Sequence, residues 1–311
     1  MGGPQCYVDG AWVPVSEARV HLFDSGLMYG DTLTETLRTF RHEPFETGLH
    51  LKRMRRSLAL ARVEVPPSVD LGGLVTEAVR RDVEAHGGEE LLVKLDVTRG
   101  HFDYYRDPSR SYADYNVLLH ALAVPFHRFA DRYEAGIAVA YPVTRQIPSQ
   151  SLDTRIKHRS RLYQAIAEWE ASDVDRGAAA LLLDVDGRVA EGTGWNVFAV
   201  LDGEVLTPSL DNCLQGVSRT VTIQLCRERG LEVRETTLWP YDLAVADEVF
   251  ATATSYCILP VTRVQGRTVG GGQPGEVTRA LTVAWSERVG VDLAAQARER
   301  AAAARPQAPV A

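Results

Sequence analysis

Three Asp-Gly pairs, each flanked by short apolar runs, constrain the fold of this chain more than any other feature. They lie at Asp9-Gly10, Asp186-Gly187 and Asp202-Gly203. An Asp-Gly pair suits the two-residue turn of a β-hairpin, because both positions need a positive φ that Asp tolerates and Gly adopts freely. Sheets built from many hairpins are antiparallel or mixed, which argues against a doubly wound parallel sheet. The sequence therefore predicts two α/β units of the α+β type with mixed or antiparallel sheets.

Hydrophobic periodicity divides the rest of the chain into strands and amphipathic helices. Alternating apolar residues or threonine-rich runs predict strands, and apolar residues spaced three or four apart predict helices. The expected strands cover residues 31–40, 91–97, 115–124, 136–141, 178–185, 188–192, 196–201, 231–236 and 249–254. The expected helices cover residues 50–61, 71–86, 159–171, 218–230 and 277–289.

The length of 311 residues exceeds what one core usually serves, so two domains are expected. We place a small N-terminal α/β domain at residues 1–124, a connector at 125–135 and a larger C-terminal domain at 136–292. Residues 293–311 are rich in alanine, arginine and proline, and we expect them to form a disordered tail.

Composition argues against several classes of function. The net charge is −7 and no block of Lys or Arg stands out, which disfavours a nucleic-acid or anionic-membrane surface. The longest apolar runs are far too short to span a membrane, and the N-terminus lacks a signal-peptide pattern. These two observations lead us to expect a cytoplasmic location. The four cysteines are scattered without a CxxC pair, so we expect reduced, mostly buried thiols and no metal site.

Lysine is rare in this chain. Of the 34 basic residues only three are lysine, namely Lys52, Lys94 and Lys157. A guanidinium cannot act as a Schiff-base nucleophile at neutral pH, so a lysine kept in such a chain is a candidate for amine chemistry. Lys94 alternates with apolar residues on a predicted strand and is expected to be structural. Lys157 has three arginines within four residues, and nearby cations disfavour a protonated amine, although a solvated basic turn has the same spacing.

Three polar motifs downstream of Lys157 share one ligand chemistry. Glu191 is followed by Gly192 and Gly194, which would let a flat ligand approach the backbone, and a carboxylate there suits a protonated ring nitrogen. Residues 214–219 open a predicted helix with Ser218 in its first turn, where free amides can bind phosphate. A hydroxyl-rich run follows at residues 252–255. Taken singly, a hairpin-edge glutamate, an N-cap serine and a polar turn explain these motifs equally well.

In this order the motifs resemble those of the class IV aminotransferases. This group includes branched-chain and D-amino acid aminotransferases, (R)-selective amine transaminases and aminodeoxychorismate lyases. The resemblance extends from Tyr7 to about Val289. It is most specific in the Glu-Gly-x-Gly-x-Asn-x-Phe run at residues 191–198 and in Leu-x-Gly-Val-Ser-Arg at residues 214–219.

The resemblance implies a two-domain fold-type IV enzyme whose larger domain binds pyridoxal 5′-phosphate (PLP), and it implies a homodimer. Lys157 would form the internal aldimine with PLP and shuttle the substrate proton, while Glu191 would pair with the pyridine nitrogen. The other expected cofactor contacts are Arg53, Leu214, Val217, Ser218 and Thr254. The reaction would move an amino group from an amino acid or amine donor to a 2-oxo acid acceptor.

The residues that bind the substrate are less well defined by the sequence. The candidates are Tyr29, Thr34, Arg38, Arg106, Trp195 and Ser255. Arg38 or Arg106 could bind a substrate carboxylate, and either could equally be a surface ion-pair partner. The aromatic residues around Arg106 suggest a bulky or aromatic substrate.

Several interpretations of the activity stay open at this point. The surroundings of Lys157 are similar to those in PLP-dependent lyases of the aminodeoxychorismate lyase type, which release pyruvate, whereas Glu35 is typical of the transaminases. Trp195 is more like the (R)-amine transaminases than the branched-chain enzymes. A non-catalytic PLP-binding homologue is a third interpretation, and the intact set of Lys157, Glu191 and Ser218 argues against it.

Overall fold

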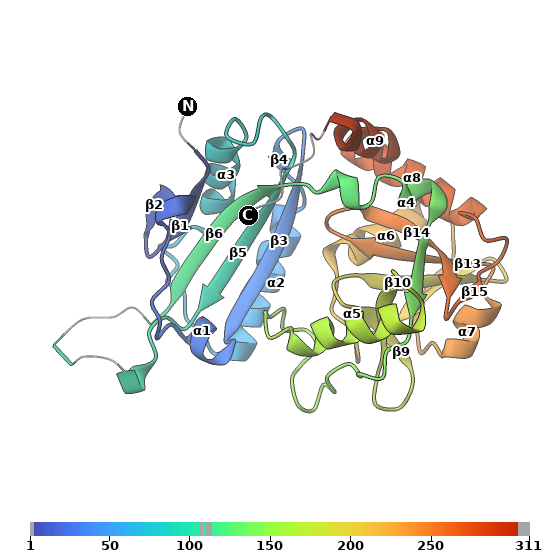
Figure 1. Cartoon of the computed structure of the whole chain (residues 1–311), viewed down its shortest axis with the longest axis horizontal. Coiled ribbons are helices and arrows are strands. Elements are labelled where there is room, and N and C mark those ends of the chain that lie inside the picture. Colours follow the sequence, from blue (N-terminus) through green and yellow to red (C-terminus); the bar gives the residue numbers. More distant parts are fainter. Residues whose placement is uncertain (1–2, 106–107, 110–113, 304–311) are drawn as a thin grey trace. The chain divides into compact units, whose positions relative to one another are not determined.

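The structure is a computed structural model that describes residues 3–105, 108–109 and 114–303. The chain divides into two compact units (Figure 1). Unit 1 runs to Val124 and includes Arg155–Leu162, whereas unit 2 comprises Pro125–Thr154 and continues from Tyr163. Each unit is built around its own β-sheet.

Unit 1 contains a six-stranded sheet in the order β2-β1-β6-β5-β3-β4, in which all neighbouring strands are antiparallel. Its strands are β1 (Gln5–Val8), β2 (Ala11–Pro14), β3 (Thr32–Phe40), β4 (Glu43–Pro44), β5 (Leu91–Thr98) and β6 (Asn116–Ala123). Its α-helices are α1 (Ser25–Tyr29), α2 (Thr47–Ala61) and α3 (Leu71–Asp82), and its 3-10 turns are η1 (Val15–Glu17) and η2 (Asp103–Tyr105).

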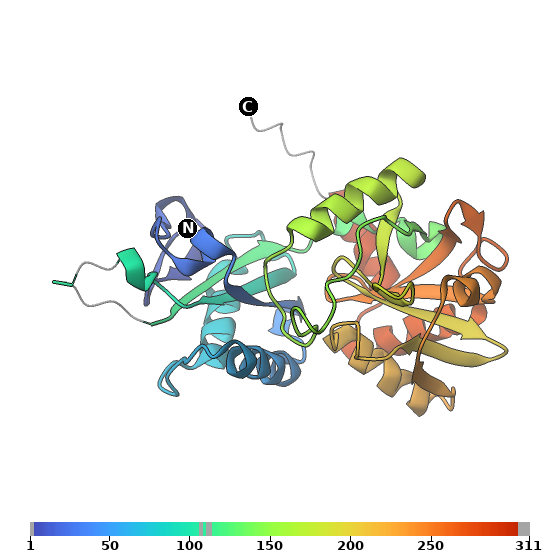
Figure 2. The same ribbon diagram turned by 90° about the horizontal axis from the view of Figure 1, so that it is seen from below.

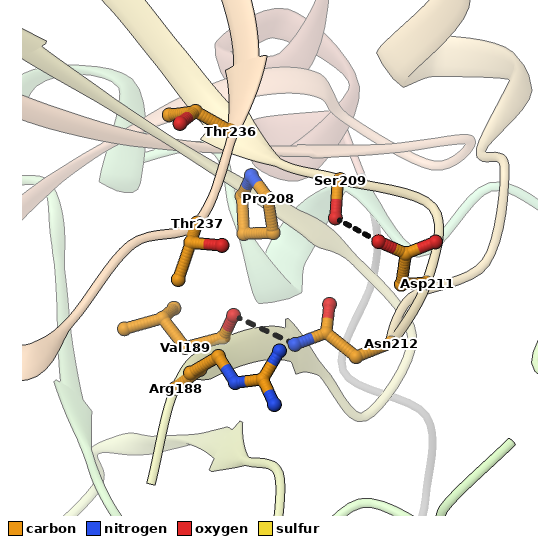
Figure 3. Close-up of a pocket in the computed structure, with 8 residues that line it drawn as sticks. All are labelled: Arg188, Val189, Pro208, Ser209, Asp211, Asn212, Thr236 and Thr237. Carbon is orange, nitrogen blue, oxygen red and sulfur yellow. Dashed lines mark hydrogen bonds between the residues drawn. The ribbon is translucent and has the colours of Figure 1, made fainter. Parts of the chain in front are cut away.

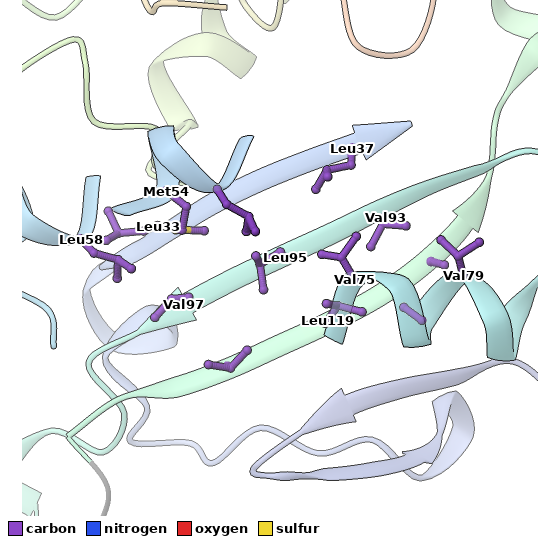
Figure 4. Close-up of a cluster of buried hydrophobic side chains, with 14 of the residues drawn as sticks. Leu33, Leu37, Met54, Leu58, Val75, Val79, Val93, Leu95, Val97 and Leu119 are labelled. Carbon is purple, nitrogen blue, oxygen red and sulfur yellow. The ribbon is translucent and has the colours of Figure 1, made fainter. Parts of the chain in front are cut away.

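The core of unit 1 lies between α2, α3 and one face of this sheet (Figures 2 and 4). Successive residues of a strand point to opposite faces, so Leu33 and Leu37 of β3 face the helices together with Leu95 of β5. Met54 and Leu58 of α2 fill the space opposite them. This packing fixes which face of β3 turns towards α2.

Unit 2 contains a mixed sheet in the order β12-β11-β10-β13-β14-β7-β8-β9, with β15 paired to β14. The pairs β11–β12, β14–β7 and β7–β8 are parallel. Its strands are β7 (Ile137–Ala140), β8 (Ala179–Leu183), β9 (Val189–Gly192), β10 (Asn196–Leu201), β11 (Glu204–Pro208), β12 (Val233–Thr236), β13 (Glu248–Ala253), β14 (Cys257–Val264) and β15 (Arg267–Thr268). Its helices are η3 (Phe126–Arg128), α4 (Arg132–Ala135), α5 (Leu162–Val174), α6 (Val217–Glu228), α7 (Pro240–Val245), α8 (Glu276–Val289) and α9 (Leu293–Ala303).

Helices α6 and α8 pack against β13, and the two helices also contact each other. Trp285 of α8 is buried and donates its indole N–H to the Oγ1 atom of Thr222 on α6 at 3.0 Å. Phe198 of β10 and Phe250 of β13 stack with ring centroids 4.9 Å apart. These contacts hold the strands that carry the downstream motifs in one rigid core.

The prediction of mixed and antiparallel sheets is confirmed, and its physical basis is visible at the turns. Asp9 and Gly10 join β1 to β2 with φ values of 51° and 80°, and Val8 pairs directly with Ala11. Asp202 and Gly203 join β10 to β11 in the same way, with φ values of 50° and 83°. Both turns have the two positive φ values of the type I′ hairpin.

The structure corrects the expected disordered tail. Residues 293–303 form helix α9, whose residues Leu293 and Ala297 are buried four positions apart and so lie on one face. Helix α9 contacts η3 in unit 2, and the backbone N–H of Leu293 donates to the Ser286 Oγ atom at 3.2 Å. The alanine-rich composition suggests disorder because a single apolar stripe of small residues gives a weak periodic signal.

The segment around Lys157 also differs from the expected division. The expected boundaries place it in the C-terminal domain, yet residues 155–162 belong to unit 1 by their contacts. The helix expected from residue 159 begins only at Leu162 and extends to Val174.

Within the described ranges, no helix is long and apolar enough to cross a membrane.

The burial pattern of α2 leads to a test of the unit 1 core. Replacing the buried Leu58 with Ala should lower the free energy of unfolding by about 2–5 kcal/mol, because it removes apolar contacts and leaves a cavity. Leu60 lies on the same helix and is exposed, so Leu60→Ala should change it by less than about 0.5 kcal/mol. Urea unfolding followed by circular dichroism measures both, and equal losses would contradict the packing described.

Candidate active site

Lys157 is held through its backbone between β3 and α2. Its carbonyl accepts a hydrogen bond from the backbone N–H of Thr34 at 2.9 Å, and its own N–H donates to the Ser57 Oγ atom at 3.1 Å. Two residues later, the N–H of Arg159 donates to the carbonyl of Thr32 at 2.9 Å. The segment thus adds a short antiparallel edge to the first half of β3.

The arginines near Lys157 do not all contribute free positive charge. The Arg159 Nε atom donates to the Asp96 carboxylate of β5 at 2.8 Å, which offsets its charge. Lys94, the lysine expected to be structural, donates from Nζ to the Thr36 Oγ1 atom at 3.1 Å. Burial, followed by the charge of Arg159, lowers the pKa of Lys94 to about 8.

Arg53 lies one turn before Ser57 on α2, in a buried cluster with Glu35 of β3 and His50 of α2. Its Nε and Nη2 atoms each donate to one carboxylate oxygen of Glu35 at 2.7 Å, and His50 Nδ1 lies 2.7 Å from the second oxygen. Burial alone would raise the pKa of Glu35, but Arg53 and His50 outweigh it and hold that pKa at about 2. The cluster therefore contains an ionised carboxylate matched by one guanidinium.

Glu191 lies on β9 in unit 2, where three donors converge on its buried carboxylate. The Gln146 Nε2 atom donates to Oε1 at 2.8 Å, and the backbone N–H of Leu214 donates to Oε2 at 3.1 Å. The Asn196 Nδ2 atom donates to Oε2 at 3.3 Å. The Tyr163 hydroxyl donates to Gln146 Oε1 at 3.1 Å, which orients the amide with its nitrogen towards Glu191.

The glycines of this region do not leave open space beside the backbone, although the sequence predicts such space at Gly192. A Cβ atom on Gly192 would lie 1.8 Å from the indole of Trp195. Trp195, a candidate substrate residue, therefore packs against the backbone of its own turn. A Cβ atom on Gly216 would lie 2.1 Å from Asn196 Oδ1. The two glycines are needed for the close packing of Trp195 and Asn196 against the backbone.

Helix α6 begins at Val217 and has an uncapped N-terminus. Gly216 is its N-cap and provides no side-chain cap hydrogen bond. Ser218 is the second helical residue, so the alternative that it acts as the N-cap is wrong. The backbone N–H groups of Val217 and Ser218 therefore lie at the positive end of the helix macrodipole, where an anion is favoured.

Strand β13, which pairs with β10, carries a buried hydroxyl. Thr252 of β13 pairs with Asn196 of β10, and its Oγ1 atom is buried without a hydrogen-bond partner among the described residues. Thr254 and Ser255 follow in the turn after β13 and are half-buried. Because a buried polar group without a partner is costly, Thr252 has the chemistry expected of a ligand contact.

The other expected substrate residues are spread over unit 1. Thr34 is adjacent to Lys157, and its buried Oγ1 atom has no partner within the described ranges. Arg38 is four residues further along β3, roughly 13 Å at the usual strand rise, and its guanidinium lies 4.3 Å from the Phe40 ring centroid. Tyr29 is exposed at the end of α1 against Phe102.

The last of the expected substrate residues, Arg106, lies outside the described residues. The structure thus brings Lys157, Arg53 and Thr34 together in unit 1, and it brings Glu191, Leu214 and the start of α6 together in unit 2. Arg38 and Tyr29 join neither group.

A small polar recess borders the loop that leads to Leu214 (Figure 3). Ser209 donates to the Asp211 carboxylate at 3.0 Å, and Asn212 Nδ2 donates to the carbonyl of Val189 at 3.3 Å. The first bond lies within the loop, and the second ties the loop to β9, the strand that carries Glu191. The recess contains none of the expected cofactor residues, so it supports the site rather than forming it.

Sequence reasoning missed Gln146 and Ser57. Gln146 lies 45 positions before Glu191 in an irregular segment, and no local pattern connects the two. Ser57 had a detectable signal, because it shares one face of α2 with His50 and Arg53 at helical spacing. A polar stripe on an otherwise apolar helix face indicates a buried network.

The chain is similar to known proteins over most of its length. The sequence matches the family described as amino-transferase class IV over residues 32–264. A protein of Methanocaldococcus jannaschii, whose name assigns it provisionally to the branched-chain-amino-acid aminotransferases, is 32% identical over 88% of this chain and 93% of its own. The branched-chain-amino-acid aminotransferase of Salmonella typhimurium is 28% identical over 90% and 91%.

Solved structures are similar over nearly the same length. The crystal structure of the branched-chain amino acid aminotransferase of Escherichia coli superposes with a TM-score of 0.82 at 27% identity, covering 92% of this chain and 94% of that one. A T.th. branched-chain amino acid aminotransferase, complexed with N-(5′-phosphopyridoxyl)-L-glutamate, superposes with a TM-score of 0.79 at 26% identity, covering 93% and 95%.

The close contact at Gly216 leads to a second test. Gly216→Ala should lower the free energy of unfolding by about 1–3 kcal/mol, because the new Cβ displaces the Asn196 amide while the backbone φ of −62° suits alanine. Gly271→Ala is the matched control, since its Cβ would meet nothing within 4 Å. Thermal unfolding compares the two, and equal melting temperatures would refute the steric argument.

Proposed function

Because the chain belongs to the class IV aminotransferases and is a PLP-dependent transaminase, we propose that it moves the amino group of a branched-chain amino acid to a 2-oxo acid. The main support is that relatives with this substrate class in their names align over about nine-tenths of the chain. These relatives do not favour the lyase or the non-catalytic alternative.

The residues of both units fit PLP by their chemistry. A ring nitrogen needs a carboxylate, a phosphate needs amides and a cation, and the carbonyl carbon needs an amine. Glu191 supplies a buried carboxylate, the start of α6 supplies amides, and Thr252 supplies a hydroxyl that lacks a partner among the described residues. When bound, PLP supplies an electron sink for the charge that develops at the substrate Cα.

In this proposal Glu191 holds the pyridinium nitrogen in its protonated form. The donors Gln146, Asn196 and Leu214 N–H all point at the carboxylate oxygens, an arrangement that suits a charged partner for the ring nitrogen. The Leu214 side chain would pack on the ring face. The hydrogen bond from the Tyr163 hydroxyl to Gln146 Oε1 orients the Gln146 amide, so that its nitrogen donates to Glu191.

The phosphate would be held by the Val217 and Ser218 amides, by Thr254 and by the Arg53 guanidinium. Helix α6 has twelve residues, and its macrodipole adds favourable charge at the N-terminus. Lys157 would hold the cofactor and move the proton at the substrate Cα. Its backbone is fixed by Thr34 and Ser57, which limits where its amine can reach.

A panel of amino donors tests the reaction and the lysine together. Valine, leucine and isoleucine as L-isomers should each remove the absorption band of the bound cofactor, while (R)-1-phenylethylamine should not. Lys157→Ala should slow this half-reaction by at least about 10²–10⁴-fold, because it removes the proton-transfer group. Lys52→Ala is the control, since Lys52 is exposed on α2.

The opposite pattern would decide against the proposal. Turnover of the amine or of D-isomers alone would move the protein to another substrate class, and pyruvate released without an acceptor would identify a lyase. A Lys157→Ala variant with an unchanged rate would remove that residue from its role.

We further propose that the protein is a homodimer in the cytoplasm. Exposed apolar side chains occur in unit 1 at Leu22 and Leu27 and on α5 of unit 2 at Trp169, as expected of surfaces that a second copy covers. All four cysteines are buried and free, which suits a reducing compartment.

Sedimentation equilibrium tests the dimer. The measured mass should be twice the 34.2 kDa of one chain. Leu27→Glu should shift the measured mass towards that of a single chain, because a buried charge disfavours the interface. Val143→Glu, at another exposed apolar position, is the control. A wild-type protein of single-chain mass at micromolar concentration would refute the proposal.

A further inference from the structure

The cluster of Glu35, His50 and Arg53 is buried in unit 1, and Glu35 and His50 take no direct part in the proposed chemistry. Glu35 has no exposed surface, and His50 is 2% exposed. Burying an ion pair costs desolvation that its attraction barely repays, and well-packed apolar residues of similar volume often stabilise as well. A pair retained at this position needs a reason other than stability.

The geometry of the pair restricts the arginine strongly. Glu35 binds Arg53 through Nε and Nη2 together, so both the plane and the direction of the guanidinium are set. The second carboxylate oxygen also receives His50 Nδ1 at 2.7 Å. Burial lowers the pKa of His50 more than Glu35 raises it, which favours the neutral ring. Next to a carboxylate acceptor, the tautomer with its hydrogen on Nδ1 can donate to Glu35.

The same helix face also reaches the catalytic lysine. Ser57 lies one turn after Arg53 on α2, and its Oγ accepts the N–H of Lys157. The backbone N–H of Thr34, next to Glu35 on β3, donates to the carbonyl of Lys157. The backbone of Lys157 is therefore fixed to β3 and α2, the same two elements that carry Glu35 and Arg53.

We propose that Glu35 is a positioning residue that orients Arg53 for the cofactor phosphate, with His50 as the second support of the carboxylate. Binding of Nε and Nη2 by Glu35 directs Nη1, the other arm of the fork, along a fixed line. The inference rests on the proposed role of Arg53. It predicts that Glu35 affects cofactor binding only where a phosphate is present.

A comparison of PLP with pyridoxal isolates this effect. Pyridoxal lacks the phosphate but offers the same carbonyl carbon to Lys157. Glu35→Gln should raise the dissociation constant of PLP by about 10- to 100-fold, the usual range for a group that orients a direct contact. It should leave the dissociation constant of pyridoxal unchanged. Titration of the cofactor-free protein, read by the absorption band of bound cofactor, measures both.

Two further variants complete the experiment. Glu77→Gln is the matched control, because Glu77 binds Arg80 and Arg81 on the surface of α3 in the same unit, and it should alter neither constant. Adding Glu35→Gln to Arg53→Ala should produce no further change in the ratio of the two constants. If Glu35→Gln does not fold, Glu35→Asp keeps the charge, shifts the fork and allows the same comparison.

The outcomes separate this inference from the proposed function. Equal weakening of PLP and pyridoxal, or no change in either, would overturn the positioning role while leaving transamination intact. A selective loss for PLP supports it. A wild-type protein that forms no absorption band with PLP would overturn the proposed function and the inference with it.

Discussion

The backbone pairing of residues 157–159 with the edge of β3 is the interaction on which the position of Lys157 depends. Lys157 comes more than thirty residues after the last strand of this unit, yet Thr34 and Ser57 fix both of its peptide groups. An exposed strand edge offers unpaired N–H and C=O groups, and here the segment with the lysine satisfies them. The lysine proposed to carry the cofactor is thereby attached through its backbone to the sheet.

Glu35 of unit 1 and Glu191 of unit 2 are both buried carboxylates, and the two are stabilised by different means. Glu35 is matched by a full positive charge from Arg53, which keeps its pKa far below the usual range despite burial. Glu191 instead receives neutral donors from Gln146, Asn196 and a backbone amide. A carboxylate balanced by an arginine has little charge left for a ligand, whereas one held by neutral amides keeps its negative charge available to a cationic ring.

Prediction succeeded where local chemistry decides the outcome. Two of the three Asp-Gly pairs form the predicted tight turns, because few residues other than Gly, Asn and Asp accept two consecutive positive φ values, and the structure has them at Asp9 and Asp202. At the third pair only Gly187 has a positive φ, and a longer loop joins β8 to β9. Prediction failed where contact with a distant or bulky residue determines the local structure. Helix α9 depends on burial of Leu293 and Ala297, and the space beside Gly192 is filled by Trp195. The first contact leaves only a weak periodic signal in the chain, and the second leaves none.

The sequence by itself determined the family, the cofactor and the mixed architecture. Motif order and turn residues can be recognised along the chain without knowledge of any tertiary contact. The tertiary structure alone decided which groups share an environment. It placed Lys157 on the edge of β3, joined Gln146 to Glu191 across 45 positions and locked Arg53 onto Glu35. These contacts arise from burial, which makes most polar groups find a partner wherever that partner lies in the sequence.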